Sequence, residues 1–274
     1  MTSEIDINSY FSRIGYQGSQ SATLQTLREL HALHPSAITF ENLDVLLQRP
    51  IRLELDAIMQ KLVTLGRGGY CYEQNTLFLA ALRTLGFEVR AVAARVQWNA
   101  GGLVAARSHM ALLLRQPDGH YIADVGFGGL TLTAPLLFEP DIEQQTAHGL
   151  YRLVRIGDEY QVQARIEATW SAMYQFSLAE QAPADWDMAN WFTSTCPDSI
   201  FTSTLIVARP HDNARYTLRN NRLRIHRPDG TTEQRLIATF SELCGVLRRD
   251  FNINLAPADE HALAQFMAKT LTAP

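Results

Sequence analysis

The segment from Arg67 to Asn75 constrains the fold most, because it places two glycines and a cysteine directly before a strongly apolar run. The apolar positions of that run are spaced by three and four residues, which predicts one buried face of a helix. They are Leu77, Phe78, Ala81, Leu82 and Leu85. Gly86 follows, where a helix commonly ends with a residue in the left-handed conformation. The pattern therefore predicts a buried helix whose first turn carries Cys71.

A cysteine in that position has two interpretations. The unpaired N–H groups and the positive dipole end of a helix favour an anion, and the reactive form of cysteine is the thiolate anion. Gly68 and Gly69 lack a Cβ, so a substrate or another backbone segment can approach the thiol closely. A lone intracellular cysteine, however, is usually a small buried apolar residue. Cys71 is a candidate nucleophile only if a base and an orienting group accompany it.

Length and composition limit the kind of protein and its partners. The 274 residues suffice for one large domain or two, and the shares of 46% apolar and 19% charged residues are typical of a globular protein. Because the net charge is −4, neither nucleic acid nor an anionic membrane is an expected partner. The N-terminus lacks the features of a signal peptide, and no apolar run approaches the roughly 18 residues of a membrane span.

Cysteine usage predicts a reducing compartment. Cys71, Cys196 and Cys244 are odd in number and far apart, which argues against a disulfide framework and for the cytoplasm. The chain has no Cys-x-x-Cys pair and no His-Glu-x-x-His motif, so no metal site is expected.

The pattern of expected elements changes along the chain. Residues 1 to about 88 have mainly helical periodicity, and Pro35 is predicted to close the second helix. From residue 87 to about 176, short apolar segments, residues 103–106 among them, alternate with turn signals, which predicts an antiparallel sheet that can close into a barrel. Strand-like segments between residues 203 and 236 then precede two expected helices, 241–251 and 258–271. The predicted class is α+β.

Eight histidines could supply the base that a cysteine nucleophile needs. Seven of them stand in polar or turn-like surroundings, and we expect these on the surface: His31, His34, His120, His148, His211, His226 and His261. His109 differs, because it opens the apolar strand expected at residues 109–114.

Strand geometry offers Asp124 as the orienting group. If the turn around Pro117-Asp118-Gly119 joins a hairpin with an even-length loop, paired residues have numbers with an odd sum, and 109 and 124 meet that condition. The likely registers place residue 111 or 113 opposite 124, and in the closer one the diagonal Cβ separation is roughly 7 Å, within reach of a carboxylate. A loop of odd length would break this parity.

Asp124 stands in an otherwise apolar strand, where an unpaired buried charge would be very costly. It therefore needs a partner such as His109. The alternative, which is common, is an aspartate at a strand end that hydrogen-bonds its own backbone.

Together these segments resemble the arylamine N-acetyltransferases. The matching segments follow the family's order over essentially the whole chain: Phe40 to Leu43, Arg67 to Asn75, Ser108 to Met110, Asp124 to Gly128, and Asn190 to Phe201. The Arg-Gly-Gly-aromatic-Cys motif is specific, whereas each of the others alone would be weak. One departure is Cys196, which stands where the family often has serine and adds a thiol that could lie near the mouth of the cleft.

The resemblance implies a fold of three parts: a helical bundle carrying the nucleophile (residues 1–88), a β-barrel carrying the histidine and aspartate (89–189) and an α/β lid (190–274). Bundle and barrel would form a core like that of the cysteine proteases. Carried over by position, Cys71 is the nucleophile, His109 the base and Asp124 the orienting carboxylate. Arg67 matches a structural charge near the junction of bundle and barrel.

The resemblance also implies substrate-binding residues. Phe40 and Phe127 match aromatic residues of the acceptor pocket, with Val96 as a neighbour, although each of the two aromatics could equally be plain core packing. Gly128, Ser199 and Phe201 are candidates for the approach of coenzyme A.

The implied activity is acetyl transfer from acetyl-CoA, a cosubstrate rather than a bound cofactor, to aromatic amines and hydrazines, with O-acetylation of N-hydroxyarylamines. It would proceed by a ping-pong mechanism through an acetyl-cysteine. Three alternatives stay open: an amide synthase relative, a cysteine amidohydrolase with the same triad, and a binding module without catalysis.

Overall fold

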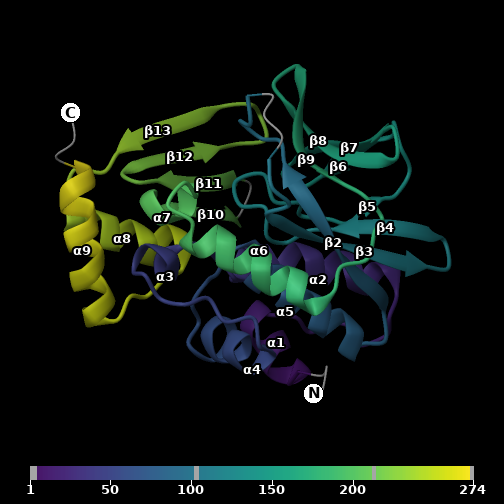
Figure 1. Ribbon diagram of the computed structural model, residues 1–274, viewed down its shortest axis with the longest axis horizontal. Coiled ribbons are helices and arrows are strands. Elements are labelled where there is room, and N and C mark those ends of the chain that lie inside the picture. The colour runs from purple at the N-terminus through teal and green to yellow at the C-terminus, as the bar shows by residue number, and fades with distance from the viewer. Residues whose placement is uncertain (1–4, 102–104, 212–213, 272–274) are drawn as a thin grey trace.

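The computed structural model describes residues 5–101, 105–211 and 214–271. The described chain contains N-terminal helices, an eight-stranded sheet, and a five-stranded sheet followed by two C-terminal helices. Figure 1 shows how these three groups are arranged. The predicted α+β class, with a helical bundle, an antiparallel barrel and a lid, is therefore confirmed. No helix among the described residues is long and apolar enough to cross a membrane.

The bundle consists of the helices before residue 88. They are α1 (Ile7–Ile14), α2 (Leu24–Ala37), α3 (Leu43–Leu46), α4 (Leu55–Ile58), the π-helix η1 (Met59–Thr64) and α5 (Cys71–Thr84). Asp6 and Thr23 cap the first two helices by accepting N–H groups of the first turn. As predicted, α5 begins at Cys71 and is followed by Gly86 in the left-handed region, at φ +85°.

Pro35 does not close α2, contrary to the prediction, because the helix continues to Ala37. A proline in a helix removes the hydrogen bond that its own missing N–H would donate to the carbonyl four residues earlier. The following turn still forms, since the N–H of Ile38 donates to the carbonyl of His34 at 2.8 Å. The loss is thus confined to one bond near the end of the helix.

The eight-stranded sheet is antiparallel and has the order β5-β4-β3-β2-β9-β8-β7-β6. Its strands are β2 (Glu88–Val96), β3 (His109–Gln116), β4 (Gly119–Ala123), β5 (Leu136–Leu137), β6 (Glu143–Thr146), β7 (Gly149–Ile156), β8 (Glu159–Ile166) and β9 (Thr169–Phe176). The sheet nearly closes, because the segment after β5 returns to β7, where Asp141 N–H donates to Leu153 O at 2.8 Å. Of the strand expected at residues 103–106, residues 103 and 104 lie outside the described chain, and 105 and 106 are not in a strand.

The hairpin of β3 and β4 has the predicted parity. Gln116 pairs with Gly119 and Leu112 with Ala123, so the residue numbers of each pair sum to 235. The loop is therefore the two residues Pro117 and Asp118, and the register extrapolates to residue 111 opposite Asp124. This is the closer of the two registers considered, which places His109 and Asp124 as diagonal neighbours.

The two faces of β3 belong to different cores, as the pleat of a strand requires. Leu112 packs with Leu77 and Phe78 of α5 in the core between bundle and sheet. Ala111 belongs to the core inside the barrel. His109 has the same parity as Ala111 and thus points into the barrel.

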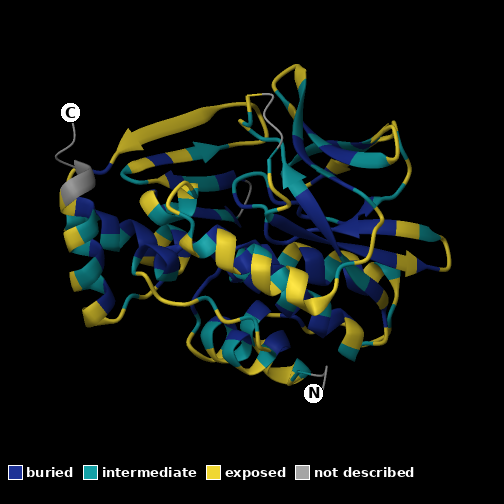
Figure 2. Cartoon of the chain, in the orientation of Figure 1, coloured by how far each residue is buried: buried dark blue, intermediate teal, exposed yellow. Residues whose placement is uncertain are grey.

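The lid contains a strand from the N-terminal part of the chain. Its sheet has the order β1 (Phe40–Glu41), β10 (Ile206–His211), β11 (Ala214–Arg219), β12 (Arg222–His226) and β13 (Thr232–Leu236), and it carries α8 (Phe240–Phe251) and α9 (Pro257–Leu271). Figure 2 shows that the outer strand, β13, is exposed along its length, whereas most residues of α5 are buried. Two helices, α6 (Pro183–Thr195) and α7 (Ile200–Ser203), link barrel and lid. The predicted boundary at residues 189–190 falls within α6, and the domain limits stay a prediction.

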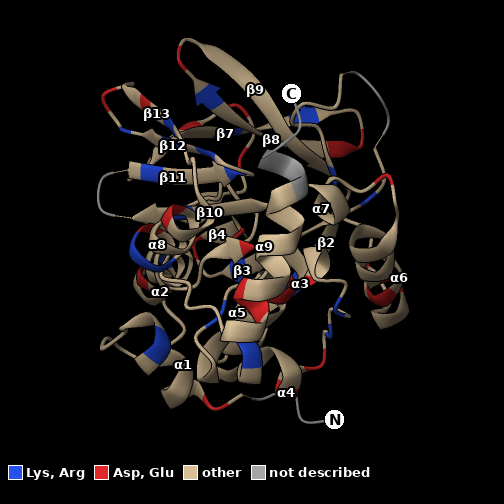
Figure 3. Ribbon diagram, turned by 90° about the vertical axis from the view of Figure 1, so that its left-hand side faces the viewer, with Lys and Arg blue, Asp and Glu red and all other residues tan. Residues whose placement is uncertain are grey.

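A cluster of ion pairs joins the bundle to the lid. Arg67 Nη2 lies 2.9 Å from Glu41 Oε1, and its Nη1 lies 3.4 Å from Asp259 Oδ2 of α9. Lys61 Nζ lies 2.7 Å from carboxylate oxygens of both Asp44 and Glu73. In Figure 3 the red ribbon segments, which mark Asp and Glu, gather where α3, α5 and α9 lie close together. Arg67 therefore connects the bundle to the lid, whereas the resemblance placed it near the junction of bundle and barrel.

Replacing Arg67 with methionine should lower the free energy of unfolding by about 3–5 kcal/mol, because Glu41 would be left as a buried charge without its partner. Denaturant titration measures the change. The matched control is Arg248→Met, which removes an exposed ion pair between α8 and α9, Arg248 Nη2 to Glu260 Oε1 at 3.8 Å, and should cost about 0–1 kcal/mol. Equal losses in the two variants would contradict the assignment.

His34 is buried, contrary to the predicted surface position. Its Nε2 lies 2.8 Å from Gln74 Oε1, and its Nδ1 lies 2.9 Å from the hydroxyl of Tyr10. The amide nitrogen of Gln74 is already bound to carbonyls, so His34 Nε2 donates and Nδ1 accepts. Burial lowers the pKa of His34 to about 3, a shift that the bond to Gln74 only partly offsets.

Stability should therefore fall as the pH decreases from about 6.5 toward 4. In this window the unfolded chain binds a proton at His34 that the folded chain does not, so the free energy of unfolding loses about 1.4 kcal/mol per pH unit from this residue. Urea titrations between pH 4.5 and 6 should give a slope smaller by about that amount in His34→Gln. An unchanged slope would show that His34 is accessible to protons in the folded state.

Candidate active site

Cys71, the first residue of α5, is almost fully buried, with 4% of its surface exposed. Tyr70, the residue before it, donates its N–H to Glu73 Oε2 at 3.1 Å. Glu73 is held in turn by Lys61. These contacts fix the start of the helix, so the N–H groups that a helix leaves unpaired in its first turn lie at the cysteine.

His109 and Asp124 form a buried pair. His109 opens β3, Asp124 follows the last residue of β4, and the distance between His109 Nε2 and Asp124 Oδ2 is 2.7 Å. The exposed fractions of the two side chains are 3% and 0%. Because Nε2 is bound to the carboxylate, Nδ1 remains for a second partner. The thiol of Cys71 lies 3.8 Å from the carbonyl of Ser108, the residue before His109.

The charges of these residues support one another. Burial alone would lower the pKa of His109, but the charge and hydrogen bond of Asp124 raise it well above its usual range. Cys71 raises it further, through a hydrogen bond and a charge interaction. Burial would raise the pKa of Asp124, and the His109 charge outweighs this and holds it below its usual value. Each group therefore stabilises the charged form of the other, carboxylate and imidazolium.

Asn75 ties this pair to the cysteine helix. Its Oδ1 accepts the N–H of Val125 at 3.1 Å, and its Nδ2 donates to Met110 O at 2.8 Å and to Asp124 Oδ1 at 3.0 Å. Met110 and Val125 also sum to 235, so the amide bridges the position where the next ladder bond of β3 and β4 would form. Asn75 was not identified as a site residue from the sequence, although its position four residues after Cys71 places both on one face of α5.

Gly126 completes the junction. Its N–H donates to Asp124 Oδ1 at 2.9 Å. A Cβ at this position would lie 2.9 Å from the Cα of Cys71, a distance that real side chains avoid. Only glycine therefore lets the segment after Asp124 pass so close to Cys71.

Aromatic rings surround His109 and the cysteine. The ring of Phe127 stands edge-on to that of His109, with centroids 5.3 Å apart. Tyr174, whose ring centroid lies 4.9 Å from that of His109, was not identified from the sequence; it pairs with Val96 across β2 and β9. Phe40 belongs to the same buried cluster as Cys71.

The remaining predicted residues differ in whether they contact the residues around Cys71. Phe201 contacts Phe40, with ring centroids 6.2 Å apart. Gly128 also lies against the Phe40 ring, since a Cβ at this position would be 3.5 Å from it. The Ser199 hydroxyl caps α7 and donates to Thr193 O at 2.6 Å, so its contacts are local. Cys196 is the half-buried residue that ends α6.

His31 is fully buried, contrary to the predicted surface position. Its Nε2 accepts the N–H of Asp124 at 3.0 Å. The signal was its spacing: it lies four residues after Leu27 and one turn before His34, on the apolar face of α2.

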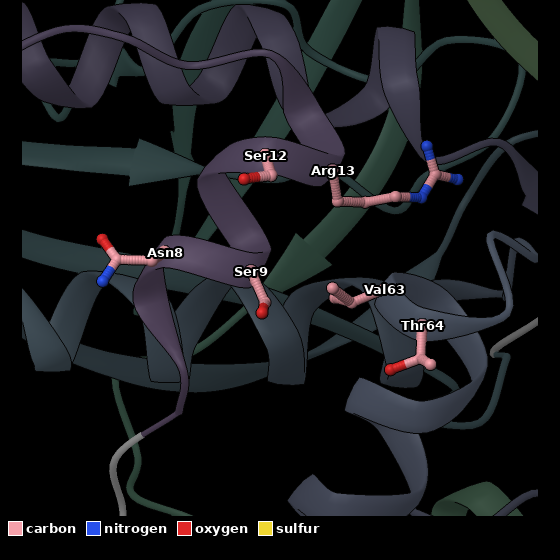
Figure 4. A pocket seen from close by; sticks show the side chains of 6 residues that line it. All are labelled: Asn8, Ser9, Ser12, Arg13, Val63 and Thr64. Atoms are coloured by element: carbon pink, nitrogen blue, oxygen red, sulfur yellow. The ribbon is translucent and has the colours of Figure 1, made fainter.

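A separate pocket of about 520 Å³ lies on the bundle surface between α1 and η1 (Figure 4). Its lining residues are Asn8, Ser9, Ser12, Arg13, Val63 and Thr64. The guanidinium of Arg13 donates to the carbonyls of Ala37 and Leu62, so its donors are used in contacts within the bundle. Among the described residues no group of three or more His, Cys, Asp or Glu side chains is placed to hold a metal.

The sequence and the fold match one family of enzymes. A family model described as N-acetyltransferase matches residues 23–260. The arylamine N-acetyltransferase of Escherichia coli K12 is 39% identical over 253 residues, which cover 92% of this chain and 90% of that protein. That of Mycolicibacterium smegmatis is 40% identical over 256 residues, 92% and 93% of the two chains. The structure of the Mycobacterium marinum arylamine N-acetyltransferase superposes with a TM-score of 0.92 at 40% identity, covering 96% of this chain and 99% of that one.

The chain belongs to the arylamine N-acetyltransferase family.

Membership makes the chain an acyltransferase and confirms the predicted family. The predicted likeness to the cysteine-protease core agrees with the structural match, since a helix bearing a thiol packs here against a sheet bearing an imidazole and a carboxylate. The roles of individual residues are a separate question, which the geometry addresses.

Asp124→Asn should lower acetyl transfer by about 10⁴-fold, the loss that the same exchange causes in a serine-protease triad. The amide removes the charge that keeps His109 protonated and can present the wrong group to Nε2. Steady-state rates with an aniline acceptor measure the loss. Asp118→Asn, in the exposed turn of the same hairpin, is the matched control and should retain the wild-type rate. A near-native rate in Asp124→Asn would refute the triad.

Proposed function

We propose that the chain transfers an acetyl group from acetyl-CoA to aromatic amines and hydrazines by a ping-pong mechanism through acetyl-Cys71. The observation that carries this proposal is the buried pair of His109 Nε2 and Asp124 Oδ2, 2.7 Å apart, beside a cysteine at a helix start. A structure of the Mycobacterium marinum relative in complex with CoA, with a TM-score of 0.92, supports acetyl-CoA as the cosubstrate.

In the first half-reaction the Cys71 thiolate attacks the carbonyl carbon of the thioester. The oxyanion that forms is stabilised by N–H groups at the start of α5. The C–S bond to coenzyme A then breaks, and the His109 imidazolium donates its proton to the leaving sulfur, so coenzyme A departs as a thiol. The products are acetyl-Cys71 and a neutral His109, still held by Asp124.

In the second half-reaction the nitrogen of the acceptor attacks the acetyl carbon of the thioester. His109 accepts the proton that the amine loses, and Cys71 leaves as a thiolate, which restores the starting ion pair. A hydroxyl oxygen can replace the nitrogen. The Salmonella typhimurium relative, 39% identical over 250 residues that cover 91% of this chain, is named for both N-acetylation and N-hydroxyarylamine O-acetylation, which supports O-acetylation as a further activity.

The acceptor pocket is assigned to Phe40, Phe127 and Val96. The rings of Phe127 and His109 are perpendicular, and an aromatic amine stacked on Phe127 would place its nitrogen near the imidazole. Phe40 packs in the same buried cluster as Cys71. The same rings exclude water from the acetyl-enzyme, which limits its hydrolysis. Gly128, Ser199 and Phe201 are assigned to the approach of coenzyme A. The three cysteines are all free, as is usual in a reducing compartment, so we place the protein in the cytoplasm.

Intact mass after incubation with acetyl-CoA alone tests the covalent step. The protein should gain the mass of one acetyl group, lose it when an aniline is added, and gain nothing in Cys71→Ser, since a serine hydroxyl is not ionised enough to replace the thiolate. Cys196→Ser and Cys244→Ser are matched controls and should be acetylated like the wild type.

Other outcomes would indicate a different activity or a different acetylated cysteine. An unchanged mass while acetylated aniline accumulates would mean direct transfer without acetyl-Cys71. Acetylation that disappears only in Cys196→Ser would show that Cys196, and not Cys71, is the nucleophile. Release of free acetate without an amine would favour an amidohydrolase, and an acetyl-enzyme that ignores simple anilines would favour an amide synthase.

A further inference from the structure

The main chain of Asp124 depends on a histidine from the bundle. His31 lies on α2, is completely buried, and packs edge-on against Phe78, with ring centroids 5.6 Å apart. Its Nε2 lies 3.0 Å from the amide nitrogen of Asp124, which is 93 positions away in the sequence. Since a main-chain N–H can only donate, the imidazole must be the acceptor.

The sheet offers no acceptor to this N–H. Successive residues of an antiparallel strand direct their N–H groups to opposite sides. The N–H of Val125 points toward β3, because it reaches Met110 through Asn75. The N–H of Asp124 therefore points to the other side of β4, where β5 pairs only with Tyr121 and Ile122. His31 Nε2 occupies the place of the missing strand carbonyl, and without it a buried donor would be unpaired.

The bond also defines the form of the imidazole. A nitrogen that accepts an N–H carries no proton, so His31 is neutral, with its proton on Nδ1. Burial agrees with this, since it lowers the pKa of His31 to about 4 despite the nearby Asp124 carboxylate. A cationic His31 would instead compete with His109 for that carboxylate.

We infer that His31 is a positioning residue: its neutral imidazole holds the Asp124 main chain so that Oδ2 stays in line with His109 Nε2. The inference rests on the proposed roles of Cys71, His109 and Asp124. The carboxylate has a short side chain, so a shift of its main chain moves Oδ2 by a similar distance. Displacement of a catalytic group by about 1 Å can cost about 100-fold in rate.

Three variants separate positioning from general stability. His31→Leu removes the acceptor with little change of volume. His31→Gln retains an oxygen that can accept the Asp124 N–H. Tyr10→Phe is the control: it deletes the hydroxyl bound to His34 in the same core, and so also leaves one buried polar atom without its partner, but it does not touch Asp124. Iodoacetamide alkylation of Cys71 against pH, acetylation by acetyl-CoA and thermal stability are measured for each.

His31→Leu should slow acetylation of Cys71 about 10- to 100-fold and shift the alkylation profile to higher pH. His31→Gln should recover most of both, and Tyr10→Phe should lose thermal stability while its rate and profile stay those of the wild type. Equal rates for His31→Leu and His31→Gln, or an equal profile shift in Tyr10→Phe, would reduce His31 to a core residue. Alkylation needs no acetyl-CoA, so a wild type that fails to become acetylated counts against the proposed function alone.

The tautomer provides a test that does not depend on a rate measurement. Nitrogen-15 spectra of the wild-type protein near neutral pH should show one buried histidine with a protonated Nδ1 and a bare Nε2, and its signals should disappear in His31→Gln. A proton on Nε2 of His31, or a doubly protonated ring at that pH, would overturn the inference.

Discussion

The carboxylate of Asp124 is a charge with no exposed surface, and the arrangement of the active site follows from the need to compensate it. An isolated carboxylate would not remain ionised in such a place. Three donors bind its oxygens, from His109, Asn75 and Gly126, and they come from β3, α5 and the chain segment that follows β4. Solvating one buried charge thus requires bundle and barrel to meet at a single point.

The same requirement explains why the cysteine helix and the hairpin cannot be displaced independently. Asn75 lies one turn after Cys71 and binds both strands of the hairpin, so the distance between thiol and imidazole is set by one side chain of α5. Gly126 then allows the strand end to contact the helix backbone. Two unreactive residues, Gly126 and the amide of Asn75, thus determine how close Cys71 comes to His109 and Asp124.

Much of this was predictable from the sequence because it follows from local rules. Helical periodicity and Gly86 indicated where α5 begins and ends, and strand parity predicted that His109 and Asp124 share a face if the hairpin loop has an even length, which it does. The two-residue turn at Pro117 and Asp118 determines the register of β3 and β4, and that register makes His109 and Asp124 diagonal neighbours. Resemblance to a family was needed for the assembly of three parts and for the pocket residues.

The errors share a different cause. His31 and His34 were expected on the surface because their sequence surroundings are polar or turn-like, yet each finds a buried partner that is distant in sequence, Asp124 or Gln74. No local pattern reveals a partner 93 positions away. Pro35 was expected to end α2, but tertiary packing retained the last turn. Local propensity failed where long-range hydrogen bonds compensated for it.

The strand β1 has a mechanical consequence. Residues 39–41 form hydrogen bonds on two sides, because Phe40 pairs with Ala208 of the lid while the N–H of Glu41 donates to Gly69 O at 3.1 Å. Gly69 stands two residues before Cys71. Paired strands and hydrogen bonds therefore run from the lid sheet to Gly69, so a displacement of the lid sheet would be transmitted to the segment that precedes Cys71. A force applied to the lid sheet would therefore reach the start of α5.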